Sequence, residues 1–432
     1  MDLELSRFLK ACNPTHPLDA SNPEDLSYYV DLSSVRGAEL IKSLKRTIAV
    51  ISPDEATCQL FTGHIGCGKS TELLRLKNEL EKQKFHVAYF ECDKQLELSD
   101  VDASDVLLAI AGQISEGLEK ENISIVSAYF TKLFGELKDL LQTKVELNAN
   151  FKLSVGIAEI TAQAKHSQSL RRQIHERLES RTNSIITAIN NELLKPAREK
   201  LKAKGMKGLV VIVDNLDRIE NRIDPKEQSR AGYLFVERGD QLRGLDCHLV
   251  YTVPLLLTFS NDAAIVTGRF GTEIKTLPMI PARLADGSEC EEGMALLRQI
   301  VMARAFPTLS PLQRIEDVHV KAVFDSPQTL DRLCQVSGGH VRNLFRFLLG
   351  CLQQDDPPIS ASLLESIIAN ERNKMRKIIT DDEWELIRKV HQDKRLSGEA
   401  QYQMLIKSQF VFEYEYQGNG WFDCNPILDK LL

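Results

Sequence analysis

Residues 63–70 read Gly63-His64-Ile65-Gly66-Cys67-Gly68-Lys69-Ser70, and the organisation of the 432-residue chain can be worked out from them. They satisfy the pattern G-x-x-x-x-G-K-[ST] at every fixed position. Glycines let the backbone turn tightly, so that several N–H groups point inward, and a following helix adds its positive N-terminal end. The stretch therefore predicts a phosphate-binding loop.

Each polar side chain of this loop has an expected role. Lys69 reaches the β- and γ-phosphates as a mobile positive charge, Ser70 supplies a magnesium ligand, and Thr71 adds a hydroxyl near the α-phosphate. The variable positions bind through their backbone and receive no catalytic role: His64, Ile65 and Cys67.

The flanking pattern is that of an open α/β sheet. An apolar strand at 58–62 leads into the loop, and an amphipathic helix at 71–83 follows it. Further apolar strands are expected at 86–92, 209–213, 249–253 and 273–279. Because helical segments separate them, we predict a mostly parallel five-stranded sheet.

A second group of polar residues follows the apolar strand 209–213. Asp214 comes directly at its carboxyl end, where an acidic residue can hold Mg²⁺ through its waters. Asn215 comes next; it cannot accept a proton but can orient water. Asp217 lies three residues after Asp214, on the same face if the chain turns helical. It is either a catalytic base or second metal-side carboxylate, or an ion-pair partner of Arg218.

With these two motifs, residues 25–350 resemble the AAA+ and STAND-like P-loop ATPases, and Asp214–Arg218 is similar to the acidic motif of KAP-type ATPases. The resemblance implies ATP and Mg²⁺ as cofactors, a helical lid after the α/β domain and, as in the origin-recognition family, a C-terminal winged helix. Many of these ATPases place a glutamate where this chain has Asn215, so we expect slow turnover, as in a switch. The chain has no N-K-x-D motif, the motif that reads guanine, which weakens an interpretation as a GTPase.

Three weaker motifs extend the resemblance. Gly268-Arg269-Phe270-Gly271 is similar to an arginine-finger segment, although a surface arginine in a turn fits equally well. Gly339-His340-Val341-Arg342 is similar to the sensor-2 element, which implies that Arg342 contacts nucleotide, with Arg346 as a competitor. Thr252 is the candidate for sensor 1.

The expected domain organisation follows the same order along the chain. We predict an N-terminal arm and helix (1–54), a P-loop ATPase domain (55–285) with a helical insertion (about 93–207), a helical lid (286–378) and a winged-helix-like domain (379–432). Within the insertion, alternating apolar residues at 145–155 and 158–164 predict a strand pair. A hairpin at 410–424 is expected to form the wing.

Composition limits the classes of partner. The formal charge of −7 excludes a global polycation, and no apolar run approaches the roughly 18–20 residues of a membrane span. Nine irregularly spaced cysteines and no visible secretory signal favour a reducing cytoplasm. Residues 165–207 hold eleven Lys/Arg against four Asp/Glu. This stretch is either a phosphate-binding surface for nucleic acid or a solvated, ion-paired face.

Two classes of function remain at this stage. The first is an ATPase that self-associates and acts as a switch or motor on a protein or nucleic-acid partner. The second is a slowly hydrolysing nucleotide sensor of the STAND type that gates a separate effector in signalling or defence.

Overall fold

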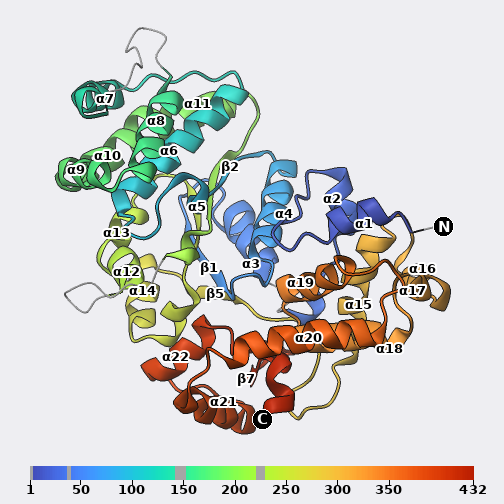
Figure 1. The fold of residues 1–432 in the computed structure, drawn as a ribbon. Helices are drawn as coiled ribbons and strands as arrows, with labels where there is room; N and C mark the ends of the chain where they lie inside the picture. Colours follow the sequence, from blue (N-terminus) through green and yellow to red (C-terminus); the bar gives the residue numbers. More distant parts are fainter. Residues whose placement is uncertain (1–2, 37–39, 142–151, 220–228) are drawn as a thin grey trace. The chain divides into compact units, whose positions relative to one another are not determined.

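The computed structural model describes residues 3–36, 40–141, 152–219 and 229–432 (Figure 1). The chain forms two compact units. Unit 1 comprises residues 1–40, 63–75 and 276–432, and unit 2 comprises residues 41–62 and 76–275. The phosphate loop thus groups with the C-terminal part of the chain. The domain boundaries expected from the sequence remain predictions.

The central sheet has five strands in the order β2-β3-β4-β1-β5. Their bounds are β1 Cys58–Gly63, β2 Phe85–Glu91, β3 Gly208–Asp214, β4 His248–Thr252 and β5 Ile274–Leu277. All five strands expected from the sequence are confirmed, and the chain has the α/β fold of P-loop NTPases. Because β2, β3 and β4 are parallel and in register, their carboxyl ends meet at one edge of the sheet.

Strand β3 shows why the apolar runs form this sheet. Every residue from Gly208 to Asp214 is buried, as expected for a strand covered on both faces. Its neighbours pair with it residue by residue, so that Glu91 of β2 lies opposite Asp214. On the other side, Val213 lies opposite Tyr251 of β4. The polar residues at these strand ends are therefore brought to the same place by register alone.

The first two thirds of the chain also contain many helices. They are α1 Leu5–Ala11, α2 Pro23–Tyr28, α3 Leu40–Arg46, α4 Lys69–Lys82, α5 Cys92–Gln95, α6 Ala103–Lys120, α7 Ala128–Leu141, α8 Leu153–His166, α9 Gln168–Leu178, α10 Thr182–Ala188, α11 Lys195–Ala203, α12 Arg230–Gly232, α13 Gly239–Leu242 and α14 Asp262–Phe270. Helix α6 packs against α8 and α10 (Figure 1). Its apolar side chains join those of β2 and β3 in one core, and a capping box formed by Asp102 and Asp105 fixes its start.

The prediction of a strand pair in the insertion is wrong for the residues that the structure describes, from 152 onward. Residues 153–166 form helix α8, and its buried side chains recur every three or four residues at Leu153, Ile157, Ile160 and Ala164. Alternation with period two and the helical period coincide at several of these positions, so the pattern was ambiguous. Most of the first expected strand falls within 142–151 and lies outside the described residues.

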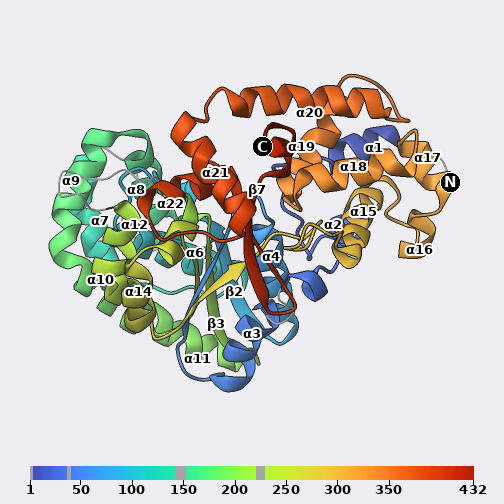
Figure 2. The same cartoon turned by 90° about the horizontal axis from the view of Figure 1, so that it is seen from below.

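The C-terminal part of unit 1 is helical and then forms a hairpin. Its elements are α15 Glu291–Ala305, α16 Pro311–Arg314, α17 Asp317–Val323, α18 Pro327–Ser337, α19 Val341–Leu352, α20 Ala361–Arg376, α21 Asp381–Asp393, α22 Ala400–Lys407, β6 Val411–Tyr416 and β7 Asn419–Cys424. Helix α19 packs between α18 and α20 (Figure 2). The antiparallel hairpin β6–β7 is confirmed. That these elements act as a lid and a winged helix stays a prediction.

No helix among the described residues is both long and apolar enough to span a membrane.

Candidate nucleotide-binding site

The phosphate loop has the backbone conformation that its glycines allow. Gly63, Gly66 and Gly68 have φ angles of 148°, 93° and 109°. A side chain at Gly66 has no room, because an added Cβ would lie 2.7 Å from His340 Cε1 and 2.9 Å from Arg342 Cβ. Both the dihedral angle and the close packing therefore require glycine at this position.

The loop carbonyls are held from outside the loop by residues of unit 1. The Arg36 guanidinium donates from Nη2 to the Cys67 carbonyl and from Nε to the Pro278 carbonyl, each at 2.8 Å. The backbone N–H of Arg342 donates to the Gly66 carbonyl at 3.1 Å. Arg36 is almost fully buried, so its charge lies beside the loop and not in bulk water.

Lys69 closes the loop from the inside. Its Nζ donates to the carbonyls of Gly63 at 2.7 Å and His64 at 3.0 Å, and its side chain is buried. Helix α4 begins at this residue, as expected for a loop that ends on a helix N-terminus. The Thr71 hydroxyl accepts a hydrogen bond from the Leu18 N–H at 3.2 Å, a role that the sequence did not indicate.

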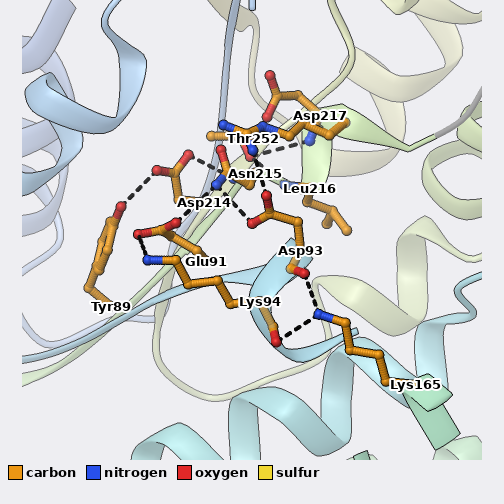
Figure 3. Close-up of polar contacts among 11 residues, drawn as sticks. Tyr89, Glu91, Asp93, Lys94, Lys165, Asp214, Asn215, Leu216, Asp217 and Thr252 are labelled. Atoms are coloured by element: carbon orange, nitrogen blue, oxygen red, sulfur yellow. Dashed lines mark hydrogen bonds and ion pairs between the residues drawn. The ribbon is translucent and has the colours of Figure 1, made fainter. Parts of the chain in front are cut away.

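Asp214 is fully buried at the end of β3 (Figure 3). Its Oδ2 accepts from the Tyr89 hydroxyl and its Oδ1 from the Asn215 N–H, both at 2.7 Å. Two hydrogen bonds to different oxygens fix the orientation of the carboxylate. A carboxylate oriented in this way suits Mg²⁺, which prefers oxygen ligands and rigid geometry.

Asn215 forms hydrogen bonds with two further carboxylates at this end of the strand. It has a φ of 60°, a conformation that asparagine tolerates better than most residues. Its side-chain amide donates to Asp93 Oδ1 at 2.9 Å and Glu91 Oε2 at 3.3 Å (Figure 3). Asp93 also pairs with Arg218 at 2.5 Å, and Glu91 with Lys94 at 2.9 Å. Arg218 thus pairs with Asp93, and the suggested Asp217–Arg218 ion pair stays a prediction.

Thr252 holds the turn that follows Asp214. Its Oγ1 donates to the Val213 carbonyl at 3.3 Å and accepts from the N–H groups of Leu216 at 3.0 Å and Asp217 at 3.4 Å. The chain does turn helical here, over Leu216–Arg218, and Asp217 is buried. Whether Thr252 also senses nucleotide stays a prediction.

The electrostatic character of this strand end is negative. Burial raises the pKa of the Cys92 thiol well above its usual value, and the charges of Asp214, Asp93 and Asp217 add to that shift. A protein places several carboxylates together most readily where a cation offsets their repulsion. With their hard oxygen ligands, these residues fit the divalent cation that accompanies a nucleotide.

The two arginines compared with arginine-finger and sensor elements differ in their surroundings. Arg269 lies near the end of α14, with Nη1 at 3.1 Å from Asp240 Oδ2. Arg346 forms an ion pair with Glu371 on α20, so its guanidinium is directed to that helix. Arg342 is the second residue of α19, and its N–H contacts the loop as described above. These contacts do not test whether Arg269 acts as an arginine finger or Arg342 as a sensor-2 residue, and both roles stay predictions.

The sequence match now agrees with this geometry. Residues 38–223 match the KAP family P-loop domain. This similarity and the topology of the sheet together identify a P-loop NTPase domain. The match includes both the phosphate loop and Asp214, and it ends just beyond the acidic turn. No curated protein matches the chain.

Solved structures resemble the chain only weakly. The ORC2 protein of Aeropyrum pernix in ADPNP–ADP complexes is 11% identical, with a TM-score of 0.34 and coverage of 89% of each chain. Drosophila ORC bound to DNA is 11% identical, with a TM-score of 0.37 and coverage of 96% of this chain and 93% of that one. CDC6P of Pyrobaculum aerophilum is 12% identical, with a TM-score of 0.35 and coverage of 94% and 95%. Similarity at this level adds no argument about function.

Several residues of the candidate site were missed by the sequence analysis. Glu91 ends β2, the strand next to β3, and Asp93 lies just beyond it, so the rule that parallel strands end at one edge was sufficient to find them. Tyr89 and Arg36 gave no comparable signal, because a tyrosine within a strand and an arginine before a glycine are common. Their roles depend on contacts between distant parts of the sequence.

The basic stretch 165–207 makes many contacts within unit 2. Arg171 is buried and pairs with Asp100 at 2.5 Å, and Arg181 forms an ion pair with Glu136. Other basic residues donate to backbone carbonyls: Lys165, Arg177, Arg198, Lys200 and Lys204. These contacts favour the interpretation as an ion-paired face.

Proposed function

We propose that this chain binds ATP together with Mg²⁺ and hydrolyses it, and that it acts as an oligomerising switch or motor on a partner. The observation that supports this best is the phosphate loop. Its three glycines have the required backbone angles, and Lys69 is held across the loop by two carbonyls. This is a preformed site for the phosphates of a nucleotide.

The proposed division of labour follows the chemistry of each side chain. Lys69 binds the β- and γ-phosphates, Ser70 ligates the metal, and Asp214 orients the water ligands of the metal. The bound Mg²⁺ supplies charge neutralisation for the phosphates. The oriented Asp214 carboxylate supports this assignment, because its two oxygens are fixed by Tyr89 and Asn215.

The attacking water needs a group that orients it and accepts its proton. Asp217 is the candidate from the sequence, and its burial at the turn after β3 is compatible with that role. Glu91 and Asp93 are further carboxylates at the same sheet edge, held by the Asn215 amide. We retain Asp217 as the first candidate and treat Asn215 as the residue that orients water.

The proposal is tested by calorimetry and phosphate release on the whole chain. Wild type is expected to bind ATP with Mg²⁺ and to release phosphate. Lys69→Ala should abolish both, and Asp214→Asn should retain binding of the nucleotide but lose at least tenfold in turnover. Absence of nucleotide binding by folded wild type would contradict the proposal.

A nucleotide sensor with little turnover is the second candidate. The observation that favours it is Asn215, whose amide donates to two carboxylates and cannot act as a base. Tight ATP binding with negligible phosphate release, unaffected by nucleic acid, would select this function over the first.

Partners and compartment are proposed on weaker grounds. Self-association through Arg269 follows the resemblance to AAA+ ATPases, and nucleic acid is a candidate partner because of the basic stretch 165–207. The basic stretch offers such a surface only where its residues are exposed, as Arg172 is. The nine free cysteines support a reducing, cytoplasmic location.

A further inference from the structure

The loop carbonyl of Ile65 is bonded by two side chains from the C-terminal part of unit 1. His340, the residue before α19, donates from Nε2 at 2.9 Å. Gln409, which precedes β6, donates from Nε2 at 3.1 Å. The Nδ1 of His340 accepts from the Asn343 N–H at 3.1 Å, so the donor at Nε2 is fixed by its partners.

The loop residue His64 is held by the same part of the chain. Its Nε2 accepts a hydrogen bond from the backbone N–H of Glu413, in β6, at 3.0 Å. Burial lowers the pKa of His64 well below its usual value, and the nearby charges of His340 and Lys69 lower it further. His64 is therefore neutral and can accept this bond.

Phe412 fills the space between the two histidines. Its ring stacks on His340 with centroids 5.5 Å apart and meets His64 edge to face at 5.5 Å. The hairpin is itself anchored within unit 1, because the Tyr414 hydroxyl donates to the Gly338 carbonyl at 3.0 Å and the Met279 N–H donates to the Glu413 carbonyl at 3.0 Å. The hairpin can thus act as a fixed support for the loop.

These bonds determine which way the loop amides point. In a trans peptide the C=O and N–H groups point in opposite directions. When His340 and Gln409 hold the Ile65 carbonyl, the N–H of Gly66 is turned away from them. Arg36 has the same effect on the N–H of Gly68 through the Cys67 carbonyl. Amides oriented before binding cost less to organise around an anion.

We propose that Gln409, His340 and the β6 backbone are positioning residues of the phosphate loop, so that the C-terminal hairpin is required for tight nucleotide binding. This rests on the proposed function of the loop. It adds that residues 275 to 349 positions away in the sequence from their partners in the loop set the affinity. In the alternative, the hairpin blocks the loop. Variants that break a bond between the hairpin and the loop would then bind ATP more tightly than wild type.

The test measures the affinity of the whole chain for ATP with Mg²⁺ by calorimetry. His64→Phe keeps a ring but removes the acceptor for the Glu413 N–H, and affinity should fall at least tenfold. His64→Gln places an amide oxygen near the Nε2 position, and affinity should return to within about threefold of wild type. Gln409→Met removes the donor to Ile65 at nearly constant size and adds no charge beside the phosphates, and affinity should again fall at least tenfold.

Two controls separate the possible failures. Gln417→Ala changes an exposed residue at the tip of the same hairpin and should leave affinity unchanged. Thermal unfolding without nucleotide identifies any variant that fails to fold. If Gln409→Met fails to fold, the His64→Phe and His64→Gln pair still tests the proposal. If wild type binds ATP but all variants bind equally well or more tightly, the positioning role is overturned while the proposed function stands. If wild type binds no nucleotide, the proposed function itself fails.

Discussion

Gly66 is the residue at which backbone conformation and packing act together. Its φ of 93° and the closeness of His340 and Arg342 both exclude a side chain. We expect Gly66→Ala to lower the free energy of unfolding by roughly 2–4 kcal/mol and to abolish nucleotide binding. Gly205 is a matched control, because its φ is 78° but an added Cβ would meet nothing within 4 Å.

Gly205→Ala should therefore lower the free energy of unfolding by only about 1 kcal/mol, because only the dihedral angle is unfavourable for alanine there. Chemical denaturation of both variants checks this difference. Equal destabilisation of the two would show that packing against the loop contributes nothing.

Asn215 gives a second prediction at the level of single residues. Asn215→Gly keeps the left-handed backbone but removes the amide that bonds Glu91 and Asp93. We expect ATP affinity within about threefold of wild type and a fall in phosphate release of at least tenfold. Asn215→Asp should lose turnover as well, because it places a third negative charge against the other two. Unchanged turnover in both would remove Asn215 from the reaction.

Asp217 is tested separately from Asn215. Asp217→Asn preserves shape and removes the basic oxygen, so phosphate release should fall at least a hundredfold if this residue accepts the proton. Glu91→Gln is the matched comparison at the same sheet edge. A large loss in Glu91→Gln together with full activity in Asp217→Asn would transfer the role to Glu91.

Among the elements, helix α19 makes stability depend on pH through its first turn. Burial lowers the pKa of His340, the N-cap residue of α19, to about 3. The folded chain keeps this histidine neutral while the unfolded chain binds a proton below about pH 6.5, so stability is present above that pH and is lost as the pH falls. Between pH 7 and 5 the expected loss is about 2 kcal/mol.

His340→Asn should remove its own part of this dependence, because asparagine can cap the helix without titrating, while the part that comes from the buried His64 stays. His166→Asn, at an exposed position, should keep the wild-type profile. Urea unfolding at pH 5, 6 and 7 measures all three chains. If the free energy of unfolding of His340→Asn changed with pH as much as that of wild type, the pH dependence would come from other residues.

The elements also show what can be learned from sequence. The five strands and the loop follow from apolar runs and glycine spacing, because local chemistry determines both. Helix α8 was mistaken for strands because its apolar residues fit two periods, and only packing against α6 selects one. Gln409 and Glu413 were missed because no local pattern reports a contact with the loop. Their roles exist only after the chain has folded.

For the whole molecule, the resemblance to ATPases that assemble side by side gives a testable expectation. If Arg269 completes a neighbouring site, Arg269→Ala should reduce phosphate release at least tenfold at concentrations where the chain self-associates. Asp240→Asn breaks the ion pair but keeps the arginine, and should leave turnover near wild type. Light scattering with and without ATP and Mg²⁺ establishes whether assemblies form. Equal rates in both variants would make Arg269 a surface residue.

The contacts between the hairpin and the phosphate loop also bear on how the protein is made. The loop leaves the ribosome early, but the residues that hold Ile65 and His64 are synthesised hundreds of residues later. A nascent or prematurely terminated chain would therefore have the sequence motif without the finished site. Translation would have to pass Glu413 before the protein could capture nucleotide tightly, which would keep incomplete products from competing for it.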